Sequence, residues 1–91
     1  MSDIHNFEKA LGKWLLKIRV EKGISQAALG LQLGKGQSDI AKIESGAKRI
    51  TVFELISWVT ALNIPYERIT EILKPLHSQL LNQKNNWKDD E

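Results

Sequence analysis

The amino-acid sequence predicts an all-α fold built from five short helices. Apolar residues recur at intervals of three and four along most of the chain, the spacing that places them on one face of a helix. The sustained alternation of apolar and polar residues that marks a half-buried strand is missing from the sequence. Glycine, serine, threonine and proline stand where the apolar runs begin or end, so the helices are expected to be joined by short connections.

The first predicted helix spans about residues 6–22. Gly23 stops its periodic pattern, and glycine is the residue most often found just past a helix C-terminus. We interpret the apolar stripe of this helix as core, because an aromatic residue at this spacing usually packs against neighbouring helices. The stripe consists of Phe7, Leu11, Trp14, Leu15 and Ile18.

A second helix is predicted over residues 26–33. Ser25 precedes it as an N-cap whose hydroxyl can accept a hydrogen bond from a free amide of the first turn. Gly34 suits the left-handed position that ends a helix. The residues expected to face inward are Ala28, Leu29 and Leu33.

The third predicted helix, residues 37–45, follows after only a cluster of glycine and lysine and ends before Gly46. Ile40 and Ile43 are spaced to face the core. The opposite face is polar, although nothing in a small core requires it to be. It carries Gln37, Ser38, Ala41, Lys42 and Ser45.

Thr51 and Glu54 form a predicted capping box at the start of a fourth helix, in which each side chain bonds the other residue's backbone amide. Asn63 is expected to stop this helix, because asparagine tolerates the left-handed conformation at a helix end. Its inner face is predicted to contain Val52, Leu55, Trp58, Val59 and Leu62.

Pro65 opens a fifth predicted helix over residues 66–73, and Pro75 is expected to interrupt it. The remaining sequence has few residues to bury, so it is expected to form one partial helix followed by a disordered end. We therefore predict a helical domain over residues 1–73 and a tail over residues 74–91.

Length and composition limit the classes of function. A chain of 91 residues with 42% hydrophobic content forms one small domain, with no second domain to house a small-molecule ligand. There is no cysteine, and the two histidines lie far apart in sequence, so we expect no disulfide, metal site or cofactor. No signal segment or membrane span is apparent, which predicts a cytoplasmic protein. No pattern of nucleophile and acid–base groups suggests an enzyme.

The positive charge is concentrated in the middle of the chain. The whole sequence has a net charge of +2, but residues 11–50 contain eight basic and three acidic residues, a net charge of +5. This asymmetry is expected when one side of a protein faces a polyanion. A solvated surface on which charge happens to cluster is the alternative interpretation.

Two short helices joined by a tight glycine-containing turn form the arrangement in which one helix crosses the DNA backbone and the next lies in the major groove. The segment "GQSDIAKIES" supplies a matching set of side chains. Glutamine can bond an adenine edge, lysine can donate to guanine acceptors, and serine can serve either. The alternative is a polar surface helix of the kind that every helical domain has.

The sequence from Leu11 to Leu73 resembles the XRE family, the DNA-binding domain of phage repressors, Cro proteins and many bacterial transcriptional regulators. The resemblance implies a five-helix, lambda-repressor-like fold with a helix-turn-helix that binds double-stranded DNA. It rests on several spaced positions at once: Arg19 four residues before Gly23, the Ser25-Gln26 pair, Leu29, Leu33-Gly34, Gln37-Ser38, Ile40, Ile43-Glu44 and Gly46.

The resemblance implies base-reading roles on the third helix. In the family, the glutamine that opens the second helix bonds a phosphate and braces the first glutamine of the recognition helix, which suggests that Gln26 steadies Gln37. Ser38 and Lys42 occupy positions from which relatives read further bases. Asp39 has two open roles, either to accept from a cytosine amino group or to stabilise the positive end of the helix.

Further positions are implied to contact phosphate or to brace the site: Ser25, Ser45, Lys48 and Arg49. Arg19 and Glu44 correspond to an ion pair that ties the first helix to the recognition helix in many relatives, although sequence alone also allows two unrelated surface charges. The turn departs from the family pattern at Lys35, where relatives often have an apolar residue. Lys13, Lys17 and Lys35 are expected to be solvated lysines.

Relatives dimerise to read two half-sites, commonly through their C-terminal helices, so a homodimer is expected here. The C-terminal candidates are Leu73, Leu76, Leu80 and Trp87, and an alternative patch consists of Leu16, Val20 and Phe53. The expected function is a transcriptional regulator that represses by occupying a promoter. The alternative is an antitoxin that neutralises a partner toxin and regulates its own operon through the same fold.

Overall fold

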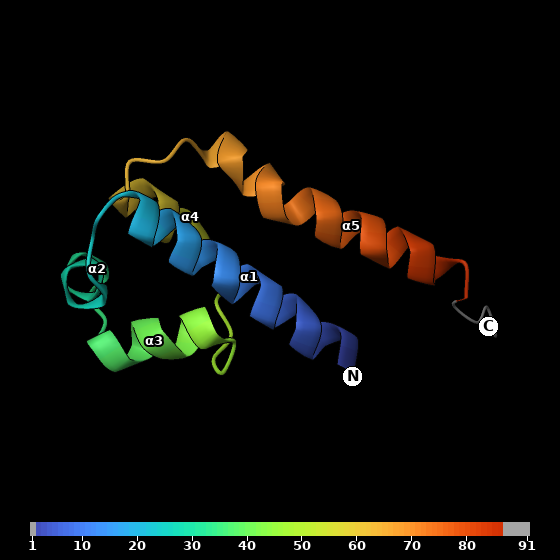
Figure 1. Ribbon diagram of the computed structural model, residues 1–91, viewed down its shortest axis with the longest axis horizontal. Coiled ribbons are helices and arrows are strands. Elements are labelled where there is room, and N and C mark those ends of the chain that lie inside the picture. The colour runs from blue at the N-terminus through green and yellow to red at the C-terminus, as the bar shows by residue number, and fades with distance from the viewer. Residues whose placement is uncertain (1, 87–91) are drawn as a thin grey trace.

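The computed structural model describes residues 2–86, and every regular element in that range is helical (Figure 1). This confirms the predicted all-α class. None of the helices between residues 2 and 86 is long and apolar enough to cross a membrane. The elements are α1 (Ser2–Glu21), α2 (Gln26–Leu33), α3 (Gln37–Ser45), α4 (Val52–Ala61), the 3-10 helix η1 (Tyr66–Ile69) and α5 (Thr70–Lys84).

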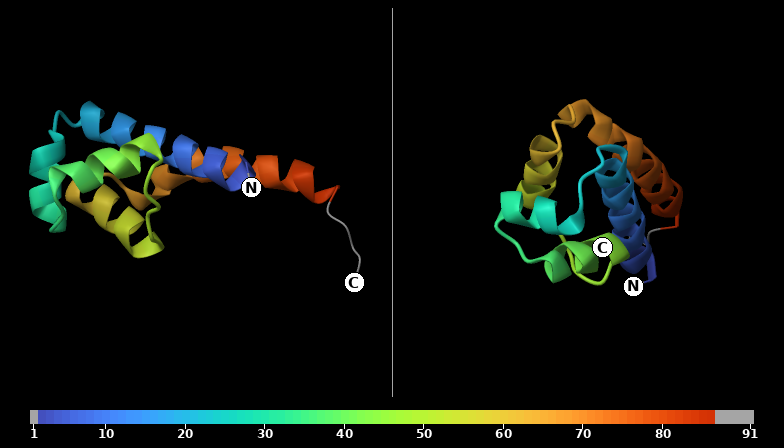
Figure 2. Two further views of the ribbon diagram at one scale, coloured as in Figure 1. Left: turned by 90° about the horizontal axis from the view of Figure 1, so that it is seen from below. Right: turned by 60° about the vertical axis from the view of Figure 1, so that its left-hand side comes forward.

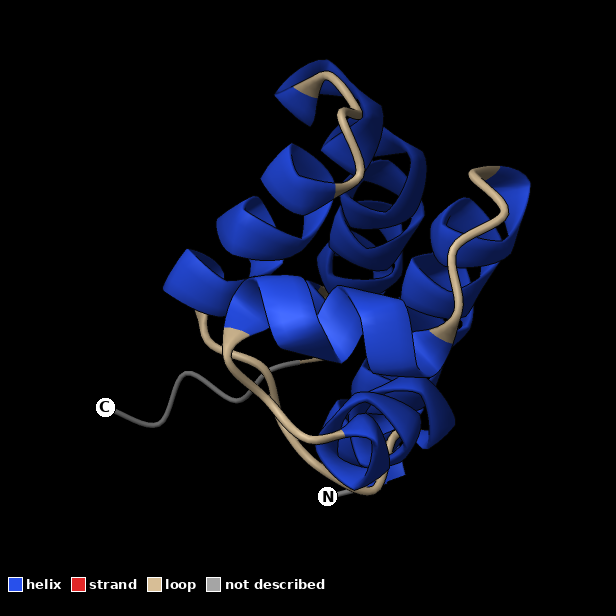
Figure 3. Ribbon diagram, turned by 90° about the vertical axis from the view of Figure 1, so that its left-hand side faces the viewer, coloured by secondary structure: helices blue, strands red, loops and turns tan. Residues whose placement is uncertain are grey.

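The first helix, α1, runs through the middle of the fold and contacts α3 on one side and α5 on another (Figures 1 and 2). The second helix, α2, packs against both α3 and α4. In Figure 3, α2 runs across the front of the molecule and α3 is seen nearly end-on below it. The α2–α3 unit therefore forms one end of the molecule and is fixed there by α1 and α4.

One hydrophobic core joins all of these elements, and its largest fully buried side chain is the indole of Trp58. Helical periodicity predicted most of its members, because residues on one face of each helix are withdrawn from water together. The predicted inward positions of Ala28 and Val52 are wrong, since both side chains are exposed near the start of their helices. The buried apolar residues are Leu11, Trp14, Leu15, Ile18, Leu29, Ile40, Ile43, Leu55, Trp58, Val59, Leu62, Ile64, Ile69, Ile72 and Leu76.

The predicted helix caps are present. Ser25 Oγ accepts a hydrogen bond from the amide of Ala28 at 3.1 Å. Thr51 and Glu54 form both bonds of the capping box, at 2.9 and 3.0 Å. Asn63, with φ of 56°, takes the left-handed conformation just after α4. The predicted caps of α2 and α4 and the predicted stop at Asn63 are therefore confirmed.

Two predicted boundaries are wrong. The first helix begins at Ser2 rather than near residue 6. The predicted helix 66–73 is instead a 3-10 turn followed by α5, which continues through Pro75 to Lys84. Ile72 before the proline and Leu76 after it are both buried, and their burial offsets the hydrogen bond that proline removes.

The continuity of α5 affects two expectations about the tail. The boundary predicted between residues 73 and 74 falls inside a single helix. Leu76 was expected as a dimerisation candidate, but it is only 6% exposed and belongs to the core of its own chain. Trp87 and the disordered end predicted for the tail lie outside the described residues.

A cluster of polar side chains ties the start of α5 to α1. Arg68 Nε donates to Glu71 at 2.8 Å, and its Nη1 donates to Glu21 at 3.1 Å. Trp14 Nε1 donates to the other oxygen of Glu71 at 3.0 Å. The bond from Arg68, followed by the bond from Trp14, lowers the pKa of Glu71 to about 2. Both partners therefore favour the charged carboxylate.

The Gly12→Ala variant should be less stable than the wild type, although alanine is the better helix former by about 1 kcal/mol. A Cβ at residue 12 would lie 2.5 Å from the carbonyl oxygen of Ile43, so α1 and α3 would have to separate. We expect a loss of about 1–3 kcal/mol in urea unfolding. Lys13→Ala, at the exposed neighbouring position, should change stability by less than about 0.5 kcal/mol. A stabilised Gly12→Ala variant would contradict this close contact.

The Glu71→Gln variant should reduce the acid sensitivity of the fold. The pKa of Glu71 is about 2 in the folded protein and 4.5 ordinarily, so below pH 4.5 the unfolded chain binds more protons. The stabilisation is complete above that value and is lost as pH falls towards 2. Melting temperatures measured between pH 6 and pH 2.5 should decline less steeply in Glu71→Gln than in the wild type. Parallel declines would show that Glu71 does not supply this pH dependence.

Candidate nucleic-acid interface

The connection between α2 and α3 is tight because two glycines permit it. Gly34 takes φ of 69° at the end of α2, a conformation that costs glycine little. The amide of Lys35 then donates back to the carbonyl of Gly30 at 2.8 Å. A side chain at residue 30 would lie 2.6 Å from the carbonyl oxygen of Lys35. The turn therefore closes directly onto α2 and fixes where α3 begins.

The third helix presents a polar face to solvent and an apolar face to the core. Ile40 and Ile43 are buried between α1 and α2. Asp39 is half-buried at the edge of the polar face. The side chains that point outward are those of Gln37, Ser38, Lys42 and Ser45. They form a continuous row of hydrogen-bonding groups.

A chain of hydrogen bonds connects this polar face to α1. Arg19 Nε and Nη2 donate to the two carboxylate oxygens of Glu44, at 2.6 and 3.0 Å. Gln26 Nε2 donates to the same carboxylate at 3.0 Å, and Gln37 Nε2 donates to Gln26 Oε1 at 3.4 Å. Glu44 is only 5% exposed. The first glutamine of α3 is thus linked through two side chains to the arginine of α1.

The arginine itself is also held in place. Its Nη1 donates to the carbonyl of Ile24, in the loop between α1 and α2, at 2.8 Å. Arg19 therefore bonds the connecting loop with one nitrogen while its other two nitrogens bind Glu44 on α3. A planar guanidinium that binds a carboxylate through two bonds fixes orientation as well as distance. This geometry sets the orientation of α2 and α3 relative to α1.

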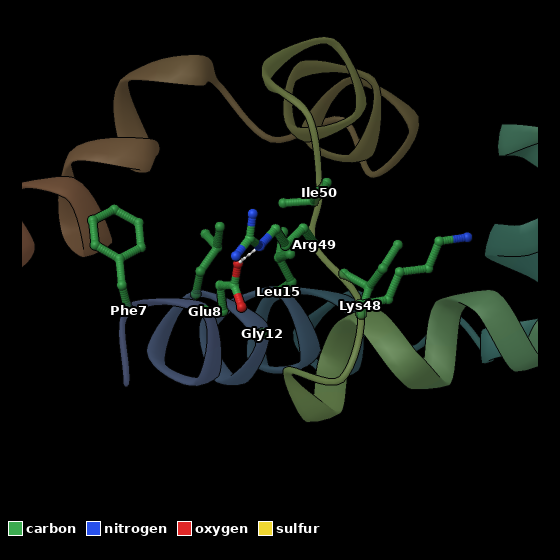
Figure 4. Close-up of a pocket in the computed structure, with 9 residues that line it drawn as sticks. Phe7, Glu8, Gly12, Leu15, Lys48, Arg49 and Ile50 are labelled. Atoms are coloured by element: carbon green, nitrogen blue, oxygen red, sulfur yellow. Dashed lines mark ion pairs between the residues drawn. The ribbon is translucent and has the colours of Figure 1, made fainter. Parts of the chain in front are cut away.

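The loop after α3 carries two cations, and each has a carboxylate partner. Lys48 Nζ lies 3.2 Å from Asp39 Oδ1, and Arg49 Nε lies 2.5 Å from Glu8 Oε2. The Arg49 side chain remains 73% exposed, and Figure 4 shows its bond to Glu8. Ion pairs whose cation is open to solvent contribute about 1 kcal/mol or less, so an external anion can compete for Lys48 and Arg49, although Glu8 itself is only 19% exposed.

An apolar cavity of about 250 Å³ lies beneath this loop. Its walls come from α1, the end of α3 and the loop itself, and Figure 4 shows Phe7 of α1 and Ile50 of the loop among the residues that line it. The loop is attached by Ile50, which packs against the core, and by the Glu8–Arg49 pair to α1. The apolar lining residues are Phe7, Leu11, Leu15, Ile43 and Ile50.

The family model for the helix-turn-helix matches residues 15–69, more than half of the chain. The chain belongs to the XRE-type helix-turn-helix family of DNA-binding proteins. This agrees with the resemblance found in the sequence, and the matched range contains both helices of the α2–α3 unit. No curated protein matches the chain.

Solved structures of two proteins share the fold of this helix-turn-helix protein. One crystal structure of the clp gene regulator ClgR from Corynebacterium glutamicum has a TM-score of 0.67 at 22% identity, over 79% of this chain and 88% of that one. A second structure of ClgR gives 0.69 at 21% identity, over 88% and 86%. A mutant of the restriction-modification controller protein C.Esp1396I gives 0.64 at 21% identity, over 82% and 91%.

Two hydroxyl groups predicted to brace the helix-turn-helix make local bonds instead of contacts between elements. Ser25 caps α2, and its hydroxyl lies at the exposed start of that helix. Ser45 Oγ donates to the carbonyl of Lys42 at 3.0 Å, within the last turn of α3. Their roles towards DNA remain predictions.

Lys35 was expected to be a solvated lysine, and this expectation is wrong. Its Nζ lies 2.5 Å from Glu54 Oε2, and its side chain is only 17% exposed. The hydrogen bond from Lys35 is the main cause that lowers the pKa of Glu54. The helix-turn-helix is thereby attached to α4 through its own turn, at a position where relatives often have an apolar residue.

Of the remaining dimerisation candidates, Leu73 and Leu80 are exposed on α5. The alternative patch is divided between two helices, with Leu16 and Val20 on α1 and Phe53 on α4. All three of these side chains are exposed. Within residues 2–86 the structure shows no group of three His, Asp or Glu side chains placed to hold a metal ion.

The Glu44→Gln variant should lose about 3 kcal/mol of unfolding free energy, because it leaves the Arg19 guanidinium without its charged partner. Guanidinium chloride unfolding followed by circular dichroism gives this value. Glu8→Gln is the matched control, since it also removes one carboxylate from an arginine, but from one that is largely exposed. Its loss should stay below about 1 kcal/mol. Equal losses in the two variants would contradict a buried bracing pair.

Proposed function

We propose that this chain is a sequence-specific regulator of transcription that binds double-stranded DNA as a homodimer and represses by occupying a promoter. The observation that carries the proposal is the outward polar face of α3, held to α1 through Gln26, Glu44 and Arg19. The same carboxylate stabilises the fold, and it also fixes the orientation of α3. A fixed orientation suits a helix that must meet base edges, because base recognition depends on the position of each donor and acceptor.

The base-reading side chains are proposed to be Gln37, Ser38 and Lys42, with Asp39 at the edge of the face. Gln37 is bonded to Gln26, so part of its conformational freedom is already lost before DNA binds. Lys42 projects from the next turn on the same exposed side. Asp39 can accept from a cytosine amino group once Lys48 turns to a phosphate.

The phosphate contacts are proposed to come from both ends of the α2–α3 unit. At one end, Lys48 and Arg49 exchange weak carboxylate partners for phosphates. At the other end, Ser25 and Gln26 open α2, whose first turn contains no acidic residue to oppose an anion. Ser45 stands near the end of the same α3 face.

The names of the structurally similar proteins support a regulatory role. One is a clp gene regulator and the other is a restriction-modification controller protein. We propose that this chain likewise controls transcription through DNA occupancy, without a chemical step. In-vitro selection of duplexes from a random pool by the purified protein tests this directly. A two-fold symmetric motif with half-site centres about 34 Å apart is expected, and failure to enrich any sequence would contradict the proposal.

Gln37→Ala and Lys48→Ala should weaken DNA binding in different ways. Gln37→Ala should cost about 1–3 kcal/mol on the selected site and nothing on random duplex, because it removes base contacts only. Lys48→Ala should weaken both duplexes to the same extent and reduce the slope of log Kd against log salt. Fluorescence anisotropy over a range of salt concentrations measures both effects. Equal weakening of selected and random duplexes by Gln37→Ala would contradict its base-reading role.

A further inference from the structure

The exposed side of α4, together with η1, carries an apolar surface that the core of this chain does not use. We call it the α4 face and define it as Val52, Phe53, Ile56 and Tyr66. Val52 and Phe53 are 76% and 79% exposed, far more than apolar residues at the edge of a core. Ile56 and Tyr66 line one shallow hollow, which joins the two elements into a continuous surface. Contiguous exposed apolar patches of this kind mark interaction sites.

The two hydroxyl groups on the same side of α4 are already hydrogen-bonded within the chain. Ser57 Oγ donates to the carbonyl of Phe53 at 2.9 Å, and Thr60 Oγ1 donates to the carbonyl of Ile56 at 2.7 Å. The acidic residue of this helix, Glu54, is bonded to Lys35 and to its own helix cap. Covering the α4 face would therefore leave the hydroxyls of Ser57 and Thr60 and the carboxylate of Glu54 paired within the chain.

Two-fold symmetry places a surface against itself, so a dimer face must not carry repeated like charge. The exposed apolar residues of α1, Leu16 and Val20, lie on a helix whose exposed positions include Lys13 and Lys17. On α5, the exposed residues around Leu73 and Leu80 include Lys74. A symmetric contact through either helix would bring lysines together, whereas the four residues of the α4 face are uncharged and the exposed charge beside them in η1 is the single carboxylate of Glu67.

The position of α4 also suits paired recognition helices. A short loop joins α3 to α4, and the two helices lie at the same end of the molecule (Figure 1). The end of α5 that carries Leu80 lies at the opposite end (Figure 1). A pair joined through α4 keeps its two α3 helices near each other, while a pair joined at the end of α5 separates them by most of the long dimension of both molecules.

We infer that a second copy of this chain docks on the α4 face, so that α4 and η1, rather than the exposed leucines of α5, form the two-fold dimer interface. The inference rests on the proposed function, because a regulator with one recognition helix needs a second copy to read two half-sites. The α4 face is the surface that holds this second copy.

The test compares Phe53→Glu with Leu80→Glu by light scattering, in the absence of DNA. Wild-type protein and Leu80→Glu should both have twice the chain mass of 10.3 kDa at 100 µM, and Phe53→Glu should have the mass of one chain. A dimeric Phe53→Glu variant would overturn the inference, as would a wild-type protein that is monomeric at this concentration. Dissociation by Leu80→Glu alone would place the interface on α5 and would also overturn it.

Circular dichroism must show that each variant keeps its helix content. Phe53 is mostly exposed, so a glutamate there is expected to leave the fold intact. Val52→Lys supplies a second variant with the opposite charge on the same face, and it should also yield a monomer. A folded dimer of either variant would exclude the α4 face as the interface.

DNA binding separates this inference from the proposed function. Phe53→Glu should bind a duplex with one half-site as the wild type does, and lose about tenfold or more of its affinity for a duplex with two. If no duplex is bound specifically but Phe53→Glu still dissociates the dimer, the proposed function fails and the interface stands. If Phe53→Glu retains full affinity for two half-sites and remains dimeric, the interface is wrong while the proposed function stands.

Discussion

The buried carboxylate of Glu44 is the interaction on which the arrangement of the recognition unit depends. Among the described residues it is the charged side chain that the core encloses, and three donor groups from Arg19 and Gln26 satisfy it. Removing a charge from water is costly unless its hydrogen bonds are complete, so α1, α2 and α3 are stable together only in the orientation that completes them. Apolar packing of Ile40 and Ile43 alone would allow α3 to shift, because dispersion contacts have no fixed direction.

Weaker ion pairs lie at the solvent side of α3. Lys48 and Arg49 are neutralised by Asp39 and Glu8 in the free protein, and both cationic side chains are exposed, at 44% and 73%, so that a phosphate can reach them. The pairs limit repulsion within the basic segment, and a phosphate that replaces a carboxylate keeps each cation paired. The buried Arg19–Glu44 pair therefore fixes the geometry of the site. The pairs of Lys48 and Arg49 leave both cations able to bind a phosphate.

The fold was predictable where local sequence decides it. Periodicity identified most of the core, although it wrongly placed Val52 inside, and the caps at Ser25 and Thr51 followed from residue type alone. The site was predictable to the extent that the family resemblance supplied its positions. The continuation of α5 through Pro75 was not predictable, because the burial of Ile72 and Leu76 on either side outweighs the tendency of proline to end a helix. The requirement for glycine at residue 12 could not be predicted from the sequence either, since it arises from the close approach of α1 to the Ile43 carbonyl of α3.

Lys35 shows why such departures matter. Sequence could not pair it with Glu54, since 19 positions separate them and both residue types are usually solvated. Their contact joins the connection between α2 and α3 to the first turn of α4 as one rigid unit. The helix α2 packs on α4 as well. If the second copy docks on α4, the position of α4 determines the position of α3 in the same chain. The Lys35–Glu54 bond and the packing of α2 on α4 connect the two helices. The spacing of two recognition helices on DNA would then be set by α4, and α5 would serve to complete the core.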